Sequence, residues 1–423
     1  MSDTKKDFDN VNTCGGRRPR ERTILHSDLN NFFAGVETAI NPELKGKAVA
    51  VCGSKENRHG IVLAKSERAK SFGVKTTMTI SEAKKFCPEL LVVSPHYKLY
   101  KEYSQRVRAI YSRYTDRTEP FGIDECWLDI TDFRTDKSGG EIADEIRETV
   151  KKEIGLTCSV GVSFNKVFAK LGSDLKKPDG TTVITRENFR EKVWRLPVED
   201  LLYVGKATVK ELNKINVFTI GDLAKTPFDF LKSKFGKSGE TLYNYANGLD
   251  DSEVRLTDEV RVPESIGRST TLYRDLKNNT EVRAVLASLC ENVAERLVKS
   301  GAGEATVLTV SVRDGNLKWF SRQEKFPYPT VLCEDFLKCA YSLFVKNYAW
   351  TTDVRSVGVS VGGFFAGAEQ TSFFKPDAVY EKKVALERCV GKLKDKYGKS
   401  GIKRGITMLD ESILPPDRED DDE

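Results

Sequence analysis

Apolar residues come in short runs along the first part of the chain, separated by amphipathic stretches. TILHSDLNNFF opens with a run typical of a buried strand, which Asp28 interrupts. KAVAVCG and HGIVLAK are two further strand-like runs, and SEAKKFCPEL is a short helix that ends at its proline. Ile142, Ile146 and Val150 have helical spacing that ends near Gly155, and the strand GLTCSVGVS and the helix KVFAKLGSDLKK follow. The pattern predicts an α/β region.

The pattern changes at about residue 187. Short helices punctuated by glycine fill residues 187–254 and predict a small all-helical module, which a charged linker follows. The last region reads strand, helix (about 281–299), two strands, helix (about 331–347), strand, which predicts a four-stranded sheet against two helices. An apolar stripe on the second of these helices is typical of core and consists of Leu332, Phe336, Ala340 and Phe344.

The composition describes a globular protein of about three domains. Of the 423 residues, 39% are hydrophobic and 31% charged, and no apolar run approaches the roughly 20 residues that span a bilayer. The polar N-terminus lacks a secretory signal, and the nine cysteines form no CxxC pair. We therefore expect a cytoplasmic protein without membrane contacts. Three histidines argue against a zinc site, so a metal would be a hard cation on carboxylates.

The charge distribution is more informative than the net charge of +5. An acidic tail, Asp417–Glu423, offsets basic residues that crowd into 166–177, 206–237 and 392–404. This distribution suits a polyanionic partner, although a solvated surface explains any single stretch equally well.

Three carboxylates stand at breaks in apolar strands. Asp124 and Glu125 are adjacent in FGIDECWLDI, and they can share a cation only at a strand end or turn, which Gly122 favours. Asp28 breaks another strand, and three acids on one sheet repel one another unless they are protonated or bind metal. Two Mg²⁺ ions on such acids would stabilise an in-line phosphoryl transfer. The alternative is a set of ordinary surface acids.

From about residue 22 to 412, the chain resembles the Y-family DNA polymerases, in the bacterial polymerase IV (DinB-like) branch. SDLNNFF resembles the first motif of that family, FGIDECWLD its second acidic motif, and VGVSFNKVFAKLGSDLKKPDG the strand and helix that complete the palm. The resemblance implies an α/β multidomain fold shaped like a right hand, with palm, fingers, thumb and little finger. The implied parts are a flexible arm (1–21), a palm of mixed sheet and helices (22–186) with small inserted fingers (about 32–97), a helical thumb (187–254), a linker (255–263), a split-βαβ little finger (264–412) and an acidic tail (413–423).

The resemblance also implies the residues of the reaction centre. Two Mg²⁺ ions, which Mn²⁺ is expected to replace, would be held by the catalytic Asp28, Asp124 and Glu125 and by the Leu29 carbonyl. Other matching positions would contact the incoming nucleotide. These are the steric gate Phe33, which would exclude a ribose 2′-OH, the backbone N–H groups of Asn31 to Phe33 including Phe32, the triphosphate contacts Lys70 and Lys177, and Ile61 and Leu63 against the nascent base pair.

Two positions depart from the family pattern. Asn30 stands where many relatives have aspartate, which removes one negative charge but leaves the direct metal ligands in place. Glu67 replaces a tyrosine that often contacts the triphosphate, and its carboxylate would repel phosphates unless Arg68 or Lys65 neutralises it. We expect Glu67→Tyr to lower the KM for dNTPs.

Two segments resemble DNA-binding parts of the family. LPVEDLLYVGKATVKELNKINVFTIGDLA resembles a helix–hairpin–helix in which Gly205 allows the hairpin, Lys206 opens the helix that faces a phosphate, and Tyr203 replaces a second glycine. ESIGRSTTL and RSVGVSVGGF resemble strands of the little finger. Their implied phosphate contacts are Arg268, Ser269 and Arg355.

The segment EQTSFFKPD resembles a sliding-clamp peptide of bacterial polymerases. The matching residues are Gln370, Ser372, Phe373 and Phe374, and packing of the two phenylalanines on their own domain is the alternative.

The predicted function is template-directed addition of dNTPs to a primer 3′-OH on primer–template DNA. The resemblance implies low processivity and lesion bypass by a monomer in the bacterial cytoplasm, associated with the nucleoid when on DNA. A catalytically inactive paralogue that binds DNA and the clamp is the alternative, which Asn30 and Glu67 favour. A palm-like nucleotidyl cyclase would share the carboxylates but leave the later regions without a function.

Overall fold

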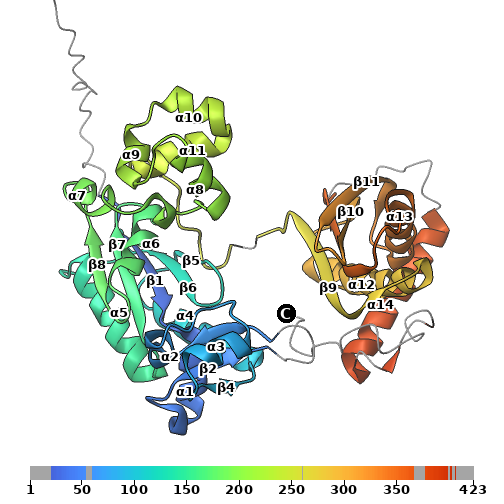
Figure 1. Cartoon of the computed structure of the whole chain (residues 1–423), viewed down its shortest axis with the longest axis horizontal. Helices are drawn as coiled ribbons and strands as arrows, with labels where there is room; N and C mark the ends of the chain where they lie inside the picture. The colour runs from blue at the N-terminus through green and yellow to red at the C-terminus, as the bar shows by residue number, and fades with distance from the viewer. Residues whose placement is uncertain are drawn as a thin grey trace, which may run out of the picture. The chain divides into compact units, whose positions relative to one another are not determined.

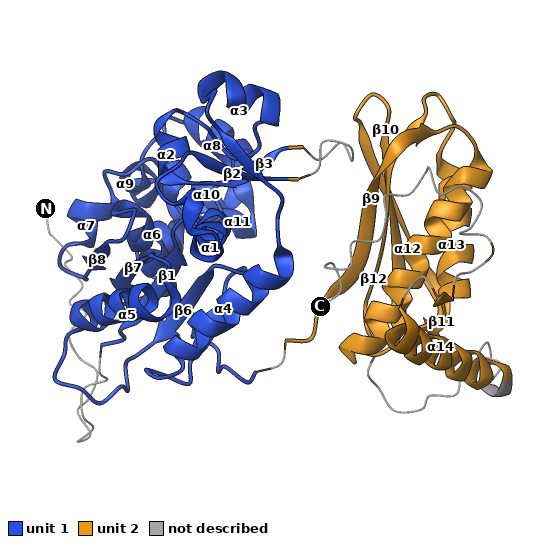
Figure 2. Ribbon diagram, turned by 90° about the horizontal axis from the view of Figure 1, so that it is seen from below, with its two compact units in different colours: residues 1–52, 61–259 blue, residues 53–60, 260–423 orange. Residues whose placement is uncertain are grey.

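The computed structural model describes residues 21–53, 60–259, 261–365, 377–398, 401–402 and 405. The chain divides into two compact units, residues 1–52 with 61–259 and residues 53–60 with 260–423 (Figure 2). The N-terminal arm up to residue 20, the clamp-like residues Gln370–Phe374 and the acidic tail lie outside the described residues. No described helix is long and apolar enough to cross a membrane.

A five-stranded sheet of order β5-β6-β1-β7-β8 lies at the centre of unit 1 (Figure 1). Its strands are β1 (Ile24–Leu29), β5 (Thr118–Pro120), β6 (Glu125–Asp129), β7 (Cys158–Ser163) and β8 (Thr181–Ile184). Three helices pack on it, namely α4 (Tyr97–Tyr111), α5 (Gly139–Ile154) and α6 (Lys166–Leu175).

Every residue of β1 is buried, because helices cover both faces of the sheet. Leu25 and Leu29 belong to the core shared with α4 and α5, whereas Ile24 packs with Ala169 of α6 on the other face. Gly161 in β7 allows α6 to approach closely, since a Cβ there would meet the Ala169 carbonyl oxygen. The predicted strand, broken by Asp28, is therefore confirmed as a central strand that ends just beyond that residue.

A small fingers-like subdomain of unit 1 follows β1. It contains α1 (Phe32–Ile40), the short 3₁₀ helix Pro42–Leu44, and a sheet of order β3-β2-β4 with two helices. The strands are β2 (Val49–Cys52), β3 (Val62–Lys65) and β4 (Leu91–Val93), and the helices are α2 (Glu67–Ser71) and α3 (Ile80–Phe86).

The predicted all-helical module is confirmed. Its helices are α7 (Phe189–Val193), α8 (Lys206–Asn213), α9 (Ile220–Lys225), α10 (Phe228–Phe235) and α11 (Lys237–Ala246), with a 3₁₀ turn at Val198–Asp200. The sequence pattern missed α10, in which only Leu231 is buried. After α11, Val254 is fully buried against Ile24 and Trp127, and Thr257 donates its N–H to the Asp116 carbonyl, so the first part of the charged linker lies on the palm-like sheet.

Unit 2 has the predicted βαββαβ order. Its sheet, of order β11-β10-β12-β9, is formed by β9 (Ser265–Leu276), β10 (Ala305–Asp314), β11 (Trp319–Thr330) and β12 (Val354–Gly362). Helices α12 (Asn279–Ser300) and α13 (Cys333–Asn347) pack on one face (Figure 2). A third helix, α14 (Asp377–Tyr397), pairs with α12 through Lys394 and Glu291, whose charged atoms lie 2.7 Å apart. Tyr380 of α14 also donates a hydrogen bond to Glu304, just before β10.

Candidate active site

The three predicted carboxylates meet at one edge of the central sheet. Asp124 lies in the turn of the β5–β6 hairpin, after Gly122 at φ 89°, and Glu125 is the first residue of β6. Glu125 pairs in register with Asp28 of the neighbouring β1, and the Leu29 N–H donates to the Asp124 carbonyl at 3.0 Å. The strand alternation fails at this turn, as the adjacent acids require, so both can lie near Asp28.

The environments of the three acids differ. Burial, followed by the charges of Asp28 and Glu125, raises the pKa of Asp124 to about 6. Burial also raises the pKa of Asp28, against the opposing effect of Lys177. Burial acts in the same direction on Glu125, but His26 and Lys170 outweigh it and lower its pKa to about 2. The cluster therefore repels further negative charge and attracts cations.

Two lysines from the α6 segment occupy this cation-attracting edge. Lys177 Nζ lies 2.7 Å from Asp28 Oδ2 and 2.8 Å from Asp174 Oδ1, and Lys170 pairs with Glu125 Oε2. His26 Nε2 lies 3.3 Å from that same Glu125 oxygen. With the side chains so placed, the described residues contain no group of three acid, His or Cys side chains that converges on one ion.

Asn30 bridges two segments instead of joining the acids. Its amide donates to Ser159 Oγ of β7 at 3.0 Å, and its Oδ1 accepts the Asp179 N–H at 2.8 Å. Asp179 in turn pairs with Arg147 and Lys151. Asn30 therefore fixes the loop that carries Lys177. An asparagine at this position thus has a structural role that does not need a carboxylate.

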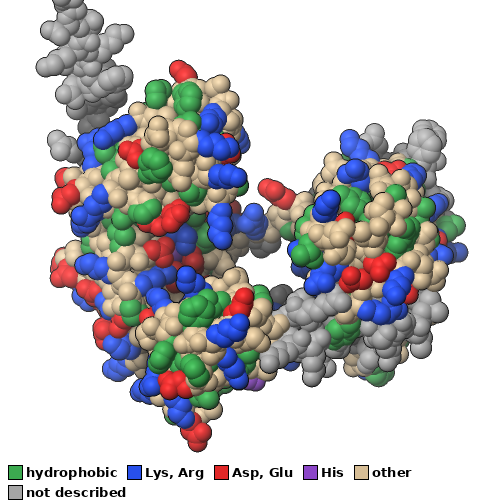
Figure 3. Space-filling model, in the orientation of Figure 1, with side chains coloured by type: hydrophobic (Ala, Val, Ile, Leu, Met, Phe, Trp, Pro, Cys, Tyr) green, Lys and Arg blue, Asp and Glu red, His purple; other side chains and the backbone are tan. Residues whose placement is uncertain are grey.

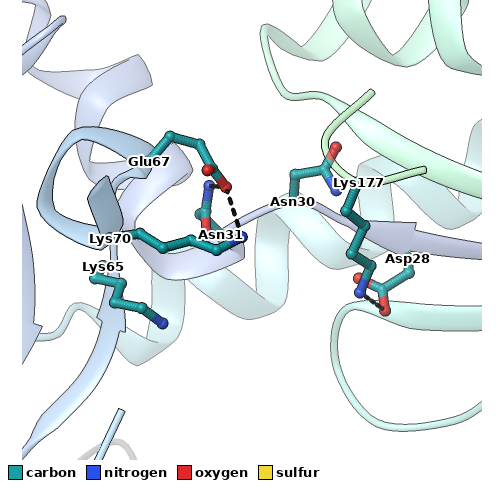
Figure 4. Close-up of a pocket in the computed structure, with 7 residues that line it drawn as sticks. All are labelled: Asp28, Asn30, Asn31, Lys65, Glu67, Lys70 and Lys177. Carbon is teal, nitrogen blue, oxygen red and sulfur yellow. Dashed lines mark hydrogen bonds and ion pairs between the residues drawn. The ribbon is translucent and has the colours of Figure 1, made fainter. Parts of the chain in front are cut away.

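A pocket of about 180 Å³ opens beside Asp28 (Figure 4). Its lining combines one sheet acid, two asparagines, one fingers-like acid and three lysines. These residues are Asp28, Asn30, Asn31, Lys65, Glu67, Lys70 and Lys177. Burial and the neighbouring charge of Lys70 lower the pKa of Lys65. Three lysines around one small pocket suit a polyanionic group such as a triphosphate.

Glu67 has partners that the sequence did not predict. Asn31 Nδ2 donates to Glu67 Oε1 at 2.8 Å, and Lys70 Nζ lies 3.6 Å from the same oxygen (Figure 4). Arg68, one of the two expected partners, instead donates to the Gly46 carbonyl and pairs with Glu89. Asn31 is the N-cap residue of α1 with a left-handed backbone (φ 50°), and its side chain makes no capping hydrogen bond.

The remaining nucleotide-binding candidates surround the start of α1. Phe32 is buried, whereas Phe33 is half-buried and its ring stacks on Tyr100 at 4.1 Å between centroids. Leu63 lies within β3 and is half-buried. Ile61, which is 36% exposed, immediately precedes that strand.

The hairpin before α8 departs from the expectation for Gly205. Gly205 has an ordinary φ of −85° and open space where a Cβ would lie, so the turn does not require glycine there. The left-handed residue is Tyr203 (φ 68°), the position at which the family has its preceding glycine. Gly205 is still the N-cap of α8 and Lys206, its first residue, is exposed. Figure 3 shows Lys and Arg side chains over this module, whose exposed lysines are Lys206, Lys210, Lys214, Lys225, Lys232, Lys234 and Lys237.

The sheet face of unit 2 opposite α12 and α13 is built of small polar residues. Buried Val310 and Val312 face the helices, so the alternating Thr309 and Ser311 face the other way. Strand register extends this open face across the sheet. Its members are Ser321, Gln323, Thr309, Ser311, Arg313, Ser356, Gly358, Ser360, Gly267, Ser269 and Thr271.

Two of the predicted phosphate contacts lie on different faces of this sheet. Ser269 pairs with Gly358 on the open face, whereas Arg268 pairs with Val359, which is buried on the helix side. Arg355 lies between Val354 and Ser356, where the register shifts. Arg313, which the sequence did not single out, lies on the open face with its guanidinium over the Trp319 ring.

Comparison with known proteins places these features in a family. Residues 27–174 match the impB/mucB/samB family, residues 263–373 match the C-terminal domain of that family, and residues 199–250 match the thumb domain of DNA polymerase iota. A DNA polymerase IV of Acetivibrio thermocellus is 47% identical over 93% of this chain and 99% of its own length. DNA polymerase IV 1 of Bacillus subtilis is 36% identical over 93% and 94%. A solved Y-family DNA polymerase chimera has the same fold, with a TM-score of 0.70, 24% identity and coverage of 82% of this chain and all of its own.

Proposed function

Because this chain belongs to the impB/mucB/samB family of Y-family DNA polymerases, we propose that it adds dNTPs to a primer 3′-OH by two-metal-ion phosphoryl transfer. Its enzyme class, DNA-directed DNA polymerase, is that of its close relatives. The observation that carries the proposal is the meeting of Asp28, Asp124 and Glu125 beside a lysine-lined pocket.

Family membership implies dependence on a divalent metal, and the donor set fits one. Carboxylate oxygens are hard ligands. Burial, followed by the negative charges of Asp28 and Glu125, raises the pKa of Asp124, and a bound cation would offset both effects. Asp28, Asp124, Glu125 and the Leu29 carbonyl would hold two ions, which would offset charge on the attacking and leaving oxygens. Lys177 and Lys170 are the internal counter-ions that such ions would replace.

The residues of the pocket have separate tasks in this proposal. Lys65, Lys70 and Lys177 bind the triphosphate, Lys177 once a metal ion has replaced it at Asp28. The first N–H groups of α1, next to the pocket residue Asn31, bind the same group in this proposal. Phe33 stands against the sugar and excludes a 2′-OH, and Ile61 and Leu63 lie against the base pair. The negative charge of Glu67 weakens the hold on phosphate, and its contacts with Asn31 and Lys70 draw the carboxylate away from that group.

The thumb-like module and the open sheet face hold the duplex. The exposed N-terminus of α8 at Gly205 and Lys206 suits a backbone phosphate. Small hydroxyl residues and glycines on the open face allow a DNA backbone to approach without reading its bases. Such a grip accepts any template, which also suits synthesis past lesions.

A primer-extension assay tests the proposal directly. The double variant Asp124→Ala/Glu125→Ala should abolish extension while the wild type extends primers with Mg²⁺ or Mn²⁺. Asp116→Ala, which removes an exposed acid before the same hairpin, is the control and should retain activity. If the wild type extends no primer with Mg²⁺ and none with Mn²⁺, the result would favour the alternative of an inactive, DNA-binding paralogue.

We also propose that Gln370, Ser372, Phe373 and Phe374 bind a sliding clamp. The support is the sequence resemblance alone. Gln370→Ala with Phe374→Ala should abolish stimulation by the clamp and spare distributive synthesis. Loss of both activities would indicate that the segment packs on its own domain.

A further inference from the structure

Glu37 is a buried carboxylate that the reaction centre does not use. It lies on α1, one helical turn after Phe33, and is 2% exposed. Its Oε1 accepts a 2.5 Å hydrogen bond from the Tyr100 hydroxyl and lies 2.9 Å from His96 Nδ1. A buried carboxylate is costly unless its hydrogen bonds are satisfied, so these two partners explain how the fold tolerates it.

Tyr100 links this carboxylate to Phe33. The two rings stack with 4.1 Å between centroids and 11° between planes. Tyr97, one turn earlier on α4, meets both rings edge-on, at 6.0 Å from Phe33 and 5.9 Å from Tyr100. Burial and the bond to Glu37 raise the pKa of Tyr100, so its hydroxyl remains a donor. The chain of contacts runs from Glu37 through Tyr100 to the plane of the Phe33 ring.

We propose that Glu37 is a positioning residue for sugar selection, which fixes the Phe33 ring through its hydrogen bond to the stacked Tyr100. A steric gate rejects a 2′-OH only if its ring cannot tilt away, and a stack alone still permits sliding in the plane. The hydrogen bond at the far end of Tyr100 removes that freedom. This inference rests on the proposed role of Phe33, and it adds residues that touch neither nucleotide nor metal.

The measurement is the ratio of kcat/KM for a dNTP to that for the matching rNTP. Tyr100→Leu, which removes the stack, should lower the ratio by about tenfold, the equivalent of one lost aromatic stack. Tyr100→Phe and Glu37→Leu both keep an aromatic ring at position 100 but break its hydrogen bond to residue 37. Each should lower the ratio by a few-fold, which is about half the effect of Tyr100→Leu in free energy. Glu37→Gln keeps an acceptor for the hydroxyl and should restore the wild-type ratio.

Tyr111→Phe is the matched control. Tyr111 lies on the same helix, is equally buried, and donates its hydroxyl to Ser27 at 2.8 Å without contacting Phe33. A variant that merely loosens the fold would lower kcat for both nucleotides and leave the ratio unchanged.

The outcomes separate this inference from the gate itself. Phe33→Leu should lower the ratio more than any Tyr100 variant. If Phe33→Leu lowers it and Tyr100→Phe does not, the positioning role of Glu37 is wrong and the gate stands, whatever the effect of Tyr100→Leu. If Phe33→Leu leaves the ratio unchanged, the gate is wrong. If Glu37→Leu fails to fold, the comparison of Tyr100→Phe with Glu37→Gln replaces it: the ratio should fall in the first variant and stay at the wild-type value in the second.

Discussion

The acid-bearing edge of the central sheet and the open sheet face of unit 2 are both built from β-strands, but they differ in charge and in the partners of their side chains. At the edge, Asp28 and Glu125 each have a lysine partner, and Asn30 ties the neighbouring loop in place. The open face carries serine, threonine and glycine at positions that are mostly reached by solvent. The edge concentrates charge at a cost in stability, whereas most positions of the open face are small and uncharged, apart from Arg313 and the neighbouring Trp319. In the proposed function, the edge needs fixed, strongly interacting groups for chemistry, whereas the open face would bind any template and needs no such groups.

The largest expected effect comes from removing charge at the edge. Asp124→Asn should lower the rate of primer extension by at least about 10³-fold, because a group at the reacting phosphate is lost. The same change should raise the free energy of unfolding of the metal-free protein by about 1 kcal/mol, since it removes a buried negative charge that Asp28 and Glu125 also repel. Single-turnover kinetics and urea unfolding measure the two effects.

Asp132→Asn is the control for Asp124→Asn, because Asp132 is an exposed acid shortly after β6, the strand that Asp124 precedes. It should change neither quantity. A loss of both activity and stability in Asp124→Asn would show that the edge is not a charge-strained site.

Adding charge to the open face should produce the next largest effect. Ser321→Glu places a carboxylate on the face opposite Ser311, and we expect primer–template affinity to fall about tenfold at low salt through phosphate repulsion. The KM for dNTP should not change at saturating DNA. Fluorescence anisotropy over a salt series measures the affinity.

Ser342→Glu, the same substitution on helix α13, provides the comparison. Equal losses of affinity in both variants would mean that net charge, and not this face, governs binding.

A smaller effect is expected in the nucleotide pocket. Glu67→Gln keeps the hydrogen bond with Asn31 but removes a negative charge from the lysine-lined pocket. The KM for dNTP should fall by about two- to fivefold with little change in kcat, as expected for an interaction with the ground state, and Glu67→Tyr should act in the same direction. Steady-state kinetics measure both variants, and an unchanged or raised KM for dNTP in either of them would contradict the prediction.

The pH dependence of stability gives the smallest effect. Asp124 has a folded pKa of about 6, above the value for an unfolded chain, so the folded state holds a proton longer. The contribution of Asp124 to stability therefore falls as pH rises through about 4 to 6. Without metal, the stability difference between Asp124→Asn and wild type should grow over that range to about 1 kcal/mol and then level off. A constant difference between pH 4 and 8 would contradict the raised pKa.

The sequence predicted most elements of the fold, because apolar periodicity reports directly which side of an element is buried. It predicted the hairpin turn at Asp124 from the requirement that adjacent acids leave the strand alternation. It missed α10, in which only Leu231 is buried, so that the helix has no apolar stripe to reveal it. It assigned the hairpin glycine role to Gly205, whereas the backbone places the left-handed residue at Tyr203.

By itself, the sequence determined the architecture, the family and the three acids, since motifs and periodicity are local in the chain. Only the tertiary structure decided the partners of those acids. Lys170 and Glu125 are 45 residues apart, Lys177 and Asp28 are 149 apart, and Glu37 meets Tyr100 across 63 residues. Such contacts depend on how helices pack on a sheet, and no local pattern records them. For that reason the contacts of Glu67 with Asn31 and Lys70, and the stack of Phe33 on Tyr100, emerged only from the folded chain.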